Sequence, residues 1–265
     1  MSAGCTVLMS ITILPAILRL TLLVAWQGSG ALGGLPGYLS TPLAILAAIL
    51  ELGASGELIH HGGLSLFRAY ASFALGGVAG VFIGLAVGSW VAVRHCFDPL
   101  VSFLYPVPKI AFLPIFLLLF GLGNGSQIAI LSFATFFPIF SAARAAVLSI
   151  NPNLLWAAAN MGAGRWRILS RVMLPAAAPQ IFSGLRIGLA HSFVLLFAAE
   201  LIGGRSGLGF LISEGEETLR FDNMFAAITI FAALGYSSDR LLMAVRTRAL
   251  RGQSIGTQEQ LEALR

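Results

Sequence analysis

Apolar residues occupy long stretches of the chain and do not alternate with polar ones. Six of these stretches are about 20 residues or longer, the length an α-helix needs to cross a hydrocarbon layer about 30 Å thick. They run from Val7 to Trp26, Leu66 to Val93, Leu100 to Phe120, Gln127 to Leu148, Ala177 to Ile202 and Asn223 to Val245. The pattern predicts an all-α integral membrane protein with about six transmembrane helices.

A shorter apolar helix is predicted between the first two spans. It covers Ser40 to Glu51 and opens with Thr41 and Pro42, a capping residue followed by proline at the first helical position. A helix of this length is too short to cross a bilayer, so we expect it to lie at the membrane interface.

The composition excludes the soluble enzyme folds. Hydrophobic residues make up 57% of the chain and charged residues only 10%, too few to coat a soluble globule. Lys109 is the one lysine among 16 basic residues and follows Pro108, so the chain has no Gly-Lys-Ser/Thr phosphate loop. Cys5 and Cys96 are too far apart for a CxxC metal site.

The basic residues indicate the orientation in the membrane. The net charge of +5 is too diffuse for a nucleic-acid surface. With the N-terminus inside, only Arg205 and Arg220 fall in outside loops, which is the positive-inside bias of cytoplasmic-membrane proteins and places both termini in the cytoplasm. The cytoplasmic set is then Arg94, Arg144, Arg165, Arg167, Arg171, Arg240, Arg246, Arg248, Arg251 and Arg265.

Glycine and proline indicate how the spans pack. Gly76, Gly80, Gly84 and Gly88 recur every four residues and form a ridge without side chains, which we interpret as packing within the bundle or between subunits. Prolines at positions 106, 108, 114 and 138 should bend the third and fourth spans.

The longest predicted cytoplasmic connection links the fourth and fifth spans. Asn151, Pro152 and Gly162 mark the ends of a short alanine-rich helix. A second short helix from Arg165 to Pro175 has apolar residues at helical spacing and is expected to lie along the membrane surface. The segment fits a docking element for another protein, or an ordinary connector anchored at the interface.

At this segment the chain resembles a known family. Ala157-Ala158, Gly162-Ala163 and, after a spacer, Val172 to Pro175 are similar to the EAA loop of binding-protein-dependent ABC importer permeases. Further segments resemble the nitrate/sulfonate/taurine branch in order and spacing. They include Ser65 to Arg68, Asp98 to Leu100, Pro106 to Ala111, Phe120 to Gly123, Phe136 to Ile139, Gly184 to Arg186, Ala199-Glu200 and Ser206 to Gly209.

The resemblance implies which residues couple transport to a separate ATPase. They are Trp156, Ala157, Ala158, Gly162, Ala163 and Arg165. The leading glutamate of the family's motif is replaced by Trp156, so we expect a more apolar contact there.

The resemblance also implies a fold and partners. It predicts the type I permease fold, with residues 1-55 forming an N-terminal transmembrane helix plus the interfacial helix, 56-251 the permease core and 252-265 a cytoplasmic tail. Implied partners are a cytosolic ABC ATPase dimer that binds ATP and Mg²⁺, an extracytoplasmic solute-binding protein and a second permease copy, with a homodimer favoured. The implied cargo is a small, anionic solute imported across a bacterial inner membrane, and no cofactor is expected in this chain.

Ionisable and polar residues within the spans are further candidates for function, because each is costly in lipid. Arg186 and Asp239 fall at similar depth and are predicted to form an ion pair, either locking two helices or contacting substrate. Candidates for the substrate path are Lys109, His191, Ser192 and Glu200. His60 and His61 are placed in a loop without the spacing of a metal site.

Two other function classes are weighed. An ion-gradient-driven secondary transporter fits the hydropathy, but the chain shows no internal repeat. Gly53 to Gly56 matches the Gly-x-Ser-Gly of rhomboid proteases, with Ser55 as nucleophile and His191 as base, but Ser55 falls outside the spans.

Overall fold

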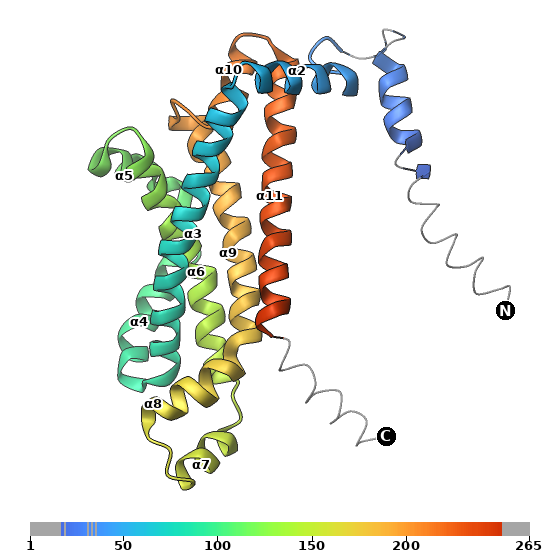
Figure 1. Ribbon diagram of the computed structural model, residues 1–265. Helices are drawn as coiled ribbons and strands as arrows, with labels where there is room; N and C mark the ends of the chain where they lie inside the picture. Colours follow the sequence, from blue (N-terminus) through green and yellow to red (C-terminus); the bar gives the residue numbers. More distant parts are fainter. Residues whose placement is uncertain (1–16, 19, 31, 33, 35, 251–265) are drawn as a thin grey trace, which may run out of the picture.

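The described part of the protein is a bundle of helices. The computed structural model describes residues 17–18, 20–30, 32, 34 and 36–250, and every element bounded in that part is helical. In chain order the elements are α2 (Pro42–Ala54), α3 (Glu57–Ser89), α4 (Val91–Leu104), the 3-10 helix η1 (Lys109–Phe112), α5 (Leu113–Phe120), α6 (Asn124–Leu148), α7 (Pro152–Asn160), α8 (Arg165–Ile168), the π-helix η2 (Leu169–Met173), α9 (Leu174–Gly203), α10 (Leu208–Glu217) and α11 (Phe221–Ala249). Figure 1 shows α2 and α10 at one end of the bundle and α7 and α8 at the other.

Four helices in this part are long and apolar enough to cross a membrane, or five if the bent pair α4 and η1–α5 counts as one span. The predicted first span, Val7 to Trp26, and the predicted tail, 252-265, lie largely or wholly outside the described residues. The second span is longer than predicted at its start, because helix α3 begins at Glu57 after Gly56, whose φ of 82° only glycine adopts readily. His60 and His61 therefore lie in the first turns of α3, and the prediction of a loop there is wrong.

The predicted third span is broken. Trp90 adopts an extended conformation, so α3 ends and α4 begins nine residues before the predicted Leu100. Pro106 and Pro108 cannot donate backbone hydrogen bonds and force a bend of 92° between α4 and the η1–α5 segment, which projects sideways from the bundle in Figure 1. Helix α6, by contrast, runs unbroken through Pro138.

The glycine ridge packs α3 directly on α6. A Cβ atom added at Gly84 would lie 2.7 Å from the Cβ of Ala143 and from the backbone oxygen of Phe140, and one at Gly88 would lie 2.6 Å from the Cβ of Val147. These distances are shorter than real carbon contacts, so only glycine permits this approach. The ridge is used within the subunit, and it gives no support to the predicted homodimer.

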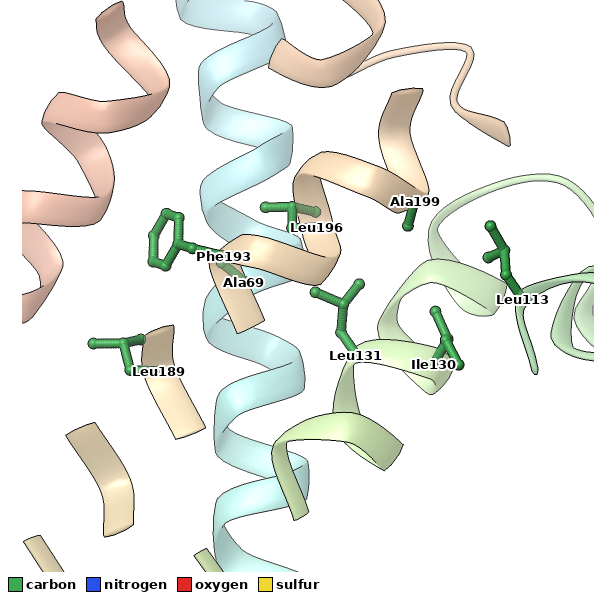
Figure 2. Close-up of a cluster of buried hydrophobic side chains, with 8 residues drawn as sticks. All are labelled: Ala69, Leu113, Ile130, Leu131, Leu189, Phe193, Leu196 and Ala199. Carbon is green, nitrogen blue, oxygen red and sulfur yellow. The ribbon is translucent and has the colours of Figure 1, made fainter. Parts of the chain in front are cut away.

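Helix α6 is the centre of a three-helix core, with α9 on its other flank. Figure 2 shows Ala69 of α3, Leu131 of α6 and Leu196 of α9 converging on one apolar cluster. All three are buried. Two further glycines on α9, at 184 and 188, leave room for Ala142 and Ile139 of α6.

Helix α2 closes one end of the bundle and is short, as predicted, while its placement at the membrane interface stays a prediction. The side chain of Thr41 accepts a hydrogen bond from the amide of Ala44, and Pro42 occupies the first turn. Ile45, Ala48 and Leu52 pack on Ala226 near the start of α11. Figure 1 shows α2 lying across the ends of α3 and α11.

Candidate functional site

The predicted coupling segment forms a separate short helix at the far end of the bundle. The side chain of Asn151 caps α7 by accepting a hydrogen bond from the amide of Asn153 at 2.9 Å. At the other end, Gly162 adopts a φ of 79° and its amide donates to Ala159, while the amide of Ala163 donates to Ala158. This paired arrangement is a Schellman motif, and its left-handed position favours glycine. Both ends are therefore fixed by local sequence.

Helix α7 presents most of its side chains to solvent, and Leu155 packs against the apolar cluster that includes Val147 and Met173. None of its residues is buried. Trp156 is 65% exposed and Met161 is 85% exposed, whereas Ala158 and Ala163 are half-buried. Ala157, Gly162 and Arg165 are also exposed. An exposed apolar helix with fixed ends is suited to dock in the groove of another protein.

The segment that follows is continuous with α9, so the prediction of a separate helix is wrong, while its placement along the membrane surface stays a prediction. Residues 165 to 203 form one continuous helical stretch. Pro175 lacks the amide that would bond the preceding turn, and the π-helix η2 accommodates this defect without ending the helix. A turn of four residues, 161 to 164, separates α7 from this stretch.

A buried ion pair at the opposite end was not predicted. Arg68 Nη1 lies 2.7 Å from Glu200 Oε1, and their side chains are 2% and 0% exposed. Glu200 also accepts hydrogen bonds from Ser65 Oγ and from the amide of Gly209, while Arg68 donates to Asn124 and to both oxygens of Ser206. This cluster, which we call the Glu200 cluster, joins α3, α6, α9 and the turn before α10.

The turn between α9 and α10 is shaped around this carboxylate. A Cβ atom at Gly207 would overlap the carboxylate of Glu200, and one at Gly209 would lie 2.6 Å from the Cβ of Glu200. The amide of Gly207 donates to Nδ1 of His61, which stacks on Phe210. The glycines allow the backbone to approach closely enough to donate hydrogen bonds to Glu200 and His61.

The other predicted path residues do not converge on one place. Lys109 Nζ donates to the carbonyl oxygens of Leu104 and Tyr105, so it caps the end of α4 at the bend. Ser192 is fully buried and contacts Ser72 Oγ and the carbonyl of Ala69. His191, one residue earlier on α9, is exposed. Their use as substrate contacts stays a prediction.

Arg186 and Asp239 lie together, in two salt-bridge hydrogen bonds of 2.7 and 3.0 Å between α9 and α11. Both are partly exposed, at 52% and 31% of their side-chain areas, and border a cavity of about 590 Å³. The pair links two helices that also meet where Phe193 of α9 packs on Phe231 of α11.

We expect Arg186→Gln or Asp239→Asn alone to lower the yield of folded protein by about threefold or more, because each leaves one unpaired charge in the membrane. The double variant should recover most of that yield, since it leaves no charge. Size-exclusion chromatography of the detergent-solubilised variants measures this. A double variant as poor as the sum of the single ones would show that the pairing does not matter.

A second partly buried ion pair joins α4 to α6. Arg144 Nη2 lies 2.6 Å from Asp98 Oδ2, and the two residues border a cavity of about 490 Å³. Arg94, near the start of the same helix α4, donates to the carbonyl oxygens of Val87 and Gly88 and so caps the end of α3. Helix α4 thus carries two charges into the bundle, and each has a partner.

The comparisons with known proteins agree with this arrangement. Residues 76–251 match the family described as "Binding-protein-dependent transport system inner membrane component". The chain belongs to this family. It is 32% identical over 240 residues to the putative aliphatic sulfonates transport permease protein SsuC of Bacillus subtilis, covering 90% of this chain and 86% of the relative. It is 34% identical over 218 residues to the taurine transport system permease protein TauC of Escherichia coli, covering 80% and 79%.

A solved structure supports the fold. An inward-facing MetNI methionine ABC transporter chain superposes with a TM-score of 0.62 at 21% identity, covering 76% of this chain and 97% of that one. This permease is therefore a multi-pass inner-membrane protein of the type I importer fold and a transport subunit, not an enzyme. Ser55, the nucleophile of the protease alternative, caps the end of α2, while its supposed base His191 lies on α9.

Proposed function

We propose that this permease forms the membrane pathway of an ATP-driven importer for small organic anions of the sulfonate class. It works as a homodimer with two cytosolic ABC ATPase subunits, which bind ATP and Mg²⁺, and receives solute from an extracytoplasmic binding protein. The sulfonate and taurine relatives support the solute class, and the family description supports the binding protein.

The observation that carries the proposal is the exposure of α7. Most of its apolar side chains are exposed, Leu155 being the one that packs on the bundle, yet its ends are fixed by hydrogen bonds and it leads through α8 and η2 into α9. A movement imposed on α7 therefore acts on α9. A tenfold bias between the two orientations of the pathway requires about 1.4 kcal/mol of coupling free energy, which a few apolar contacts can supply.

The charge distribution supports the orientation. The end of the bundle that carries α7 holds the arginines of α8 and of the last turn of α11, whereas the α10 end holds Arg205 and Arg220. With α7 in the cytoplasm, both chain termini face the cytoplasm, and the α2 and α10 end meets the binding protein.

Photo-crosslinking from α7 tests the proposal. In a background of Cys5→Ser and Cys96→Ser, Met161→Cys is labelled with benzophenone maleimide in the complex purified from native membranes. We expect an adduct with an ABC ATPase, identified by mass spectrometry. The matched control is Ile59→Cys. Ile59 is 75% exposed and lies near the start of α3, at the end of the bundle away from α7, so this variant should give no ATPase adduct.

Uptake assays test the proposed solute class and the requirement for ATP. Proteoliposomes containing the purified complex and its binding protein should accumulate labelled taurine or ethanesulfonate only with internal ATP. Uptake driven by an ion gradient without ATP, or an ATPase adduct from Ile59→Cys and none from Met161→Cys, would contradict the proposal.

A further inference from the structure

A cavity between α4 and α6 combines polar groups with an apolar wall. It has a volume of about 490 Å³, and its polar lining comes from Asp98, Ser102, Tyr105, Ser141 and Arg144. Val101, Pro106 and Phe140 complete the lining. We call this space the Arg144 pocket. Its volume falls within the range of about 300 to 1,000 Å³ found for small-molecule sites, and its polar lining is open at the surface.

Arg144 uses only part of its hydrogen-bonding capacity. Its Nη2 donates to Asp98 Oδ2 at 2.6 Å, but its Nε is buried and has no acceptor in the described part of the chain. A guanidinium group carries five N–H donors in a planar fork suited to two oxygens of one anion. The buried Nε cannot reach a molecule in the pocket, but only one of the four Nη hydrogens is used by Asp98, which leaves donor capacity for another oxyanion.

Hydroxyl groups add to this donor capacity. Among the described residues, the side-chain hydroxyls of Ser102, Tyr105 and Ser141 make no hydrogen bond, although all three residues line the pocket. The ring of Tyr105 is held in place by Phe137 and by the ammonium group of Lys109. Three free hydroxyls and a half-used guanidinium are the partners that an oxyanion with several oxygens requires.

The pocket lies toward the end of the bundle that carries α7. Arg144 lies four residues before the end of α6 and Tyr105 directly follows α4, which corresponds to depths of about 6 and 21 Å from the α7 end of these helices. The pocket thus spans the half of the bundle that faces the cytoplasm in the proposed orientation. Ser102 and Tyr105 are exposed, and Asp98 is half-buried.

We propose that the Arg144 pocket binds the anionic head group of the transported solute, with Arg144, Ser102, Ser141 and Tyr105 as its ligands and Phe140 and Val101 against its organic part. This inference rests on the proposed function and names the contact site within it. Asp98 acts as an internal counterion that weakens anion binding enough for release, as a transport site requires, while the ammonium group of Lys109 over the ring of Tyr105 leaves the pocket with a net positive charge.

Charge-selective thiol labelling tests the pocket without knowledge of the natural solute. Val101→Cys is introduced into the Cys5→Ser, Cys96→Ser protein, because Val101 lines the pocket without supplying a polar side chain. The complex in nanodiscs is treated with anionic sulfonatoethyl or cationic trimethylammonioethyl methanethiosulfonate. In either case the thiolate attacks the sulfenyl sulfur, a mixed disulfide forms and methanesulfinate leaves.

We expect the ratio of anionic to cationic labelling rates to be about tenfold higher at Val101→Cys than at Ser149→Cys, an exposed control just beyond the end of α6. Adding Arg144→Gln should bring the two ratios together, while Arg144→Lys should keep most of the preference. Ethanesulfonate should slow labelling at Val101→Cys, and neutral ethyl methyl sulfone should not.

Equal ratios at the two positions, a ratio unchanged by Arg144→Gln in protein that still elutes as a single species, or no labelling of Val101→Cys by either reagent would overturn the inference. These results are separable from a failure of the proposed function. ATP-driven uptake without charge selectivity at Val101→Cys rejects the pocket alone, whereas charge selectivity without ATP-driven uptake rejects the importer.

Discussion

Glu200→Ala is expected to destabilise the protein more than any other single change in the bundle. It leaves the guanidinium group of Arg68 buried at 2% exposure without its carboxylate, and it removes the acceptor for Ser65 and Gly209. Removing one partner of a buried ion pair costs about 3 to 5 kcal/mol, a large part of the stability of a typical protein. We expect the thermal unfolding midpoint to fall by about 10 °C or more.

The double variant Arg68→Ala, Glu200→Ala distinguishes the cost of an unpaired buried charge from the cost of the other lost hydrogen bonds. Because the second substitution removes the orphaned charge, we expect it to be no less stable than Glu200→Ala alone. Nano-scanning fluorimetry of the purified variants measures the three midpoints, with Asp239→Asn as a control at a more exposed ion pair. A midpoint for Glu200→Ala within about 2 °C of the parent would show that the Glu200 cluster does not stabilise the fold.

The second large effect is expected at the glycine ridge. In Gly84→Val the added atoms meet the backbone oxygen of Phe140 and the Cβ of Ala143, neither of which can move without displacing α6. Overpacking of this kind costs about 3 kcal/mol and separates α3 from α6 along the whole contact. We expect a strong loss of folded protein, measured by its monodisperse yield and unfolding midpoint.

Gly63→Ala is the matched control, because it lies on the same helix with no atom within 4 Å of the added carbon. It should be neutral or stabilise the helix by up to about 1 kcal/mol. If Gly84→Val and Gly63→Ala have the same stability, the close approach of α3 and α6 is not what requires glycine.

Local signals in the sequence were sufficient for the two ends of α7. Asn151, Pro152 and Gly162 bound α7 as predicted, since caps and left-handed positions depend only on neighbouring residues. The glycine spacing likewise predicted close helix packing, but it did not indicate which helix packs there. The structure identifies that helix as α6.

Local signals could not predict the Glu200 cluster, because Arg68 and Ser65 precede Glu200 by 132 and 135 residues in the chain. Hydropathy shows that Arg68 and Glu200 lie in or near spans but not how α3 and α9 are rotated toward each other. The available signal was chemical: two lone opposite charges in apolar helices, with a glycine-rich turn directly after the second. The Arg144 pocket depends in the same way on the rotation of α4 and α6.

The broken third span shows a different limit. Pro106 and Pro108 predicted a bend, but a proline pattern specifies where the helix stops and not the direction in which the chain continues. The π-helix η2 before Pro175 is the converse case, in which a proline is absorbed within a continuous helical stretch. Tertiary packing decides between these two outcomes.

The connection from α7 through η2 to α9 has a geometric consequence for transport. Helix α9 has 30 residues and is about 45 Å long, and its far end carries Glu200 and the turn into α10. A tilt of only about 5° about the start of α9 would displace that far end by about 4 Å. Small angular changes imposed in the cytoplasm would thereby be amplified into motions the size of a solute at the opposite surface of the membrane.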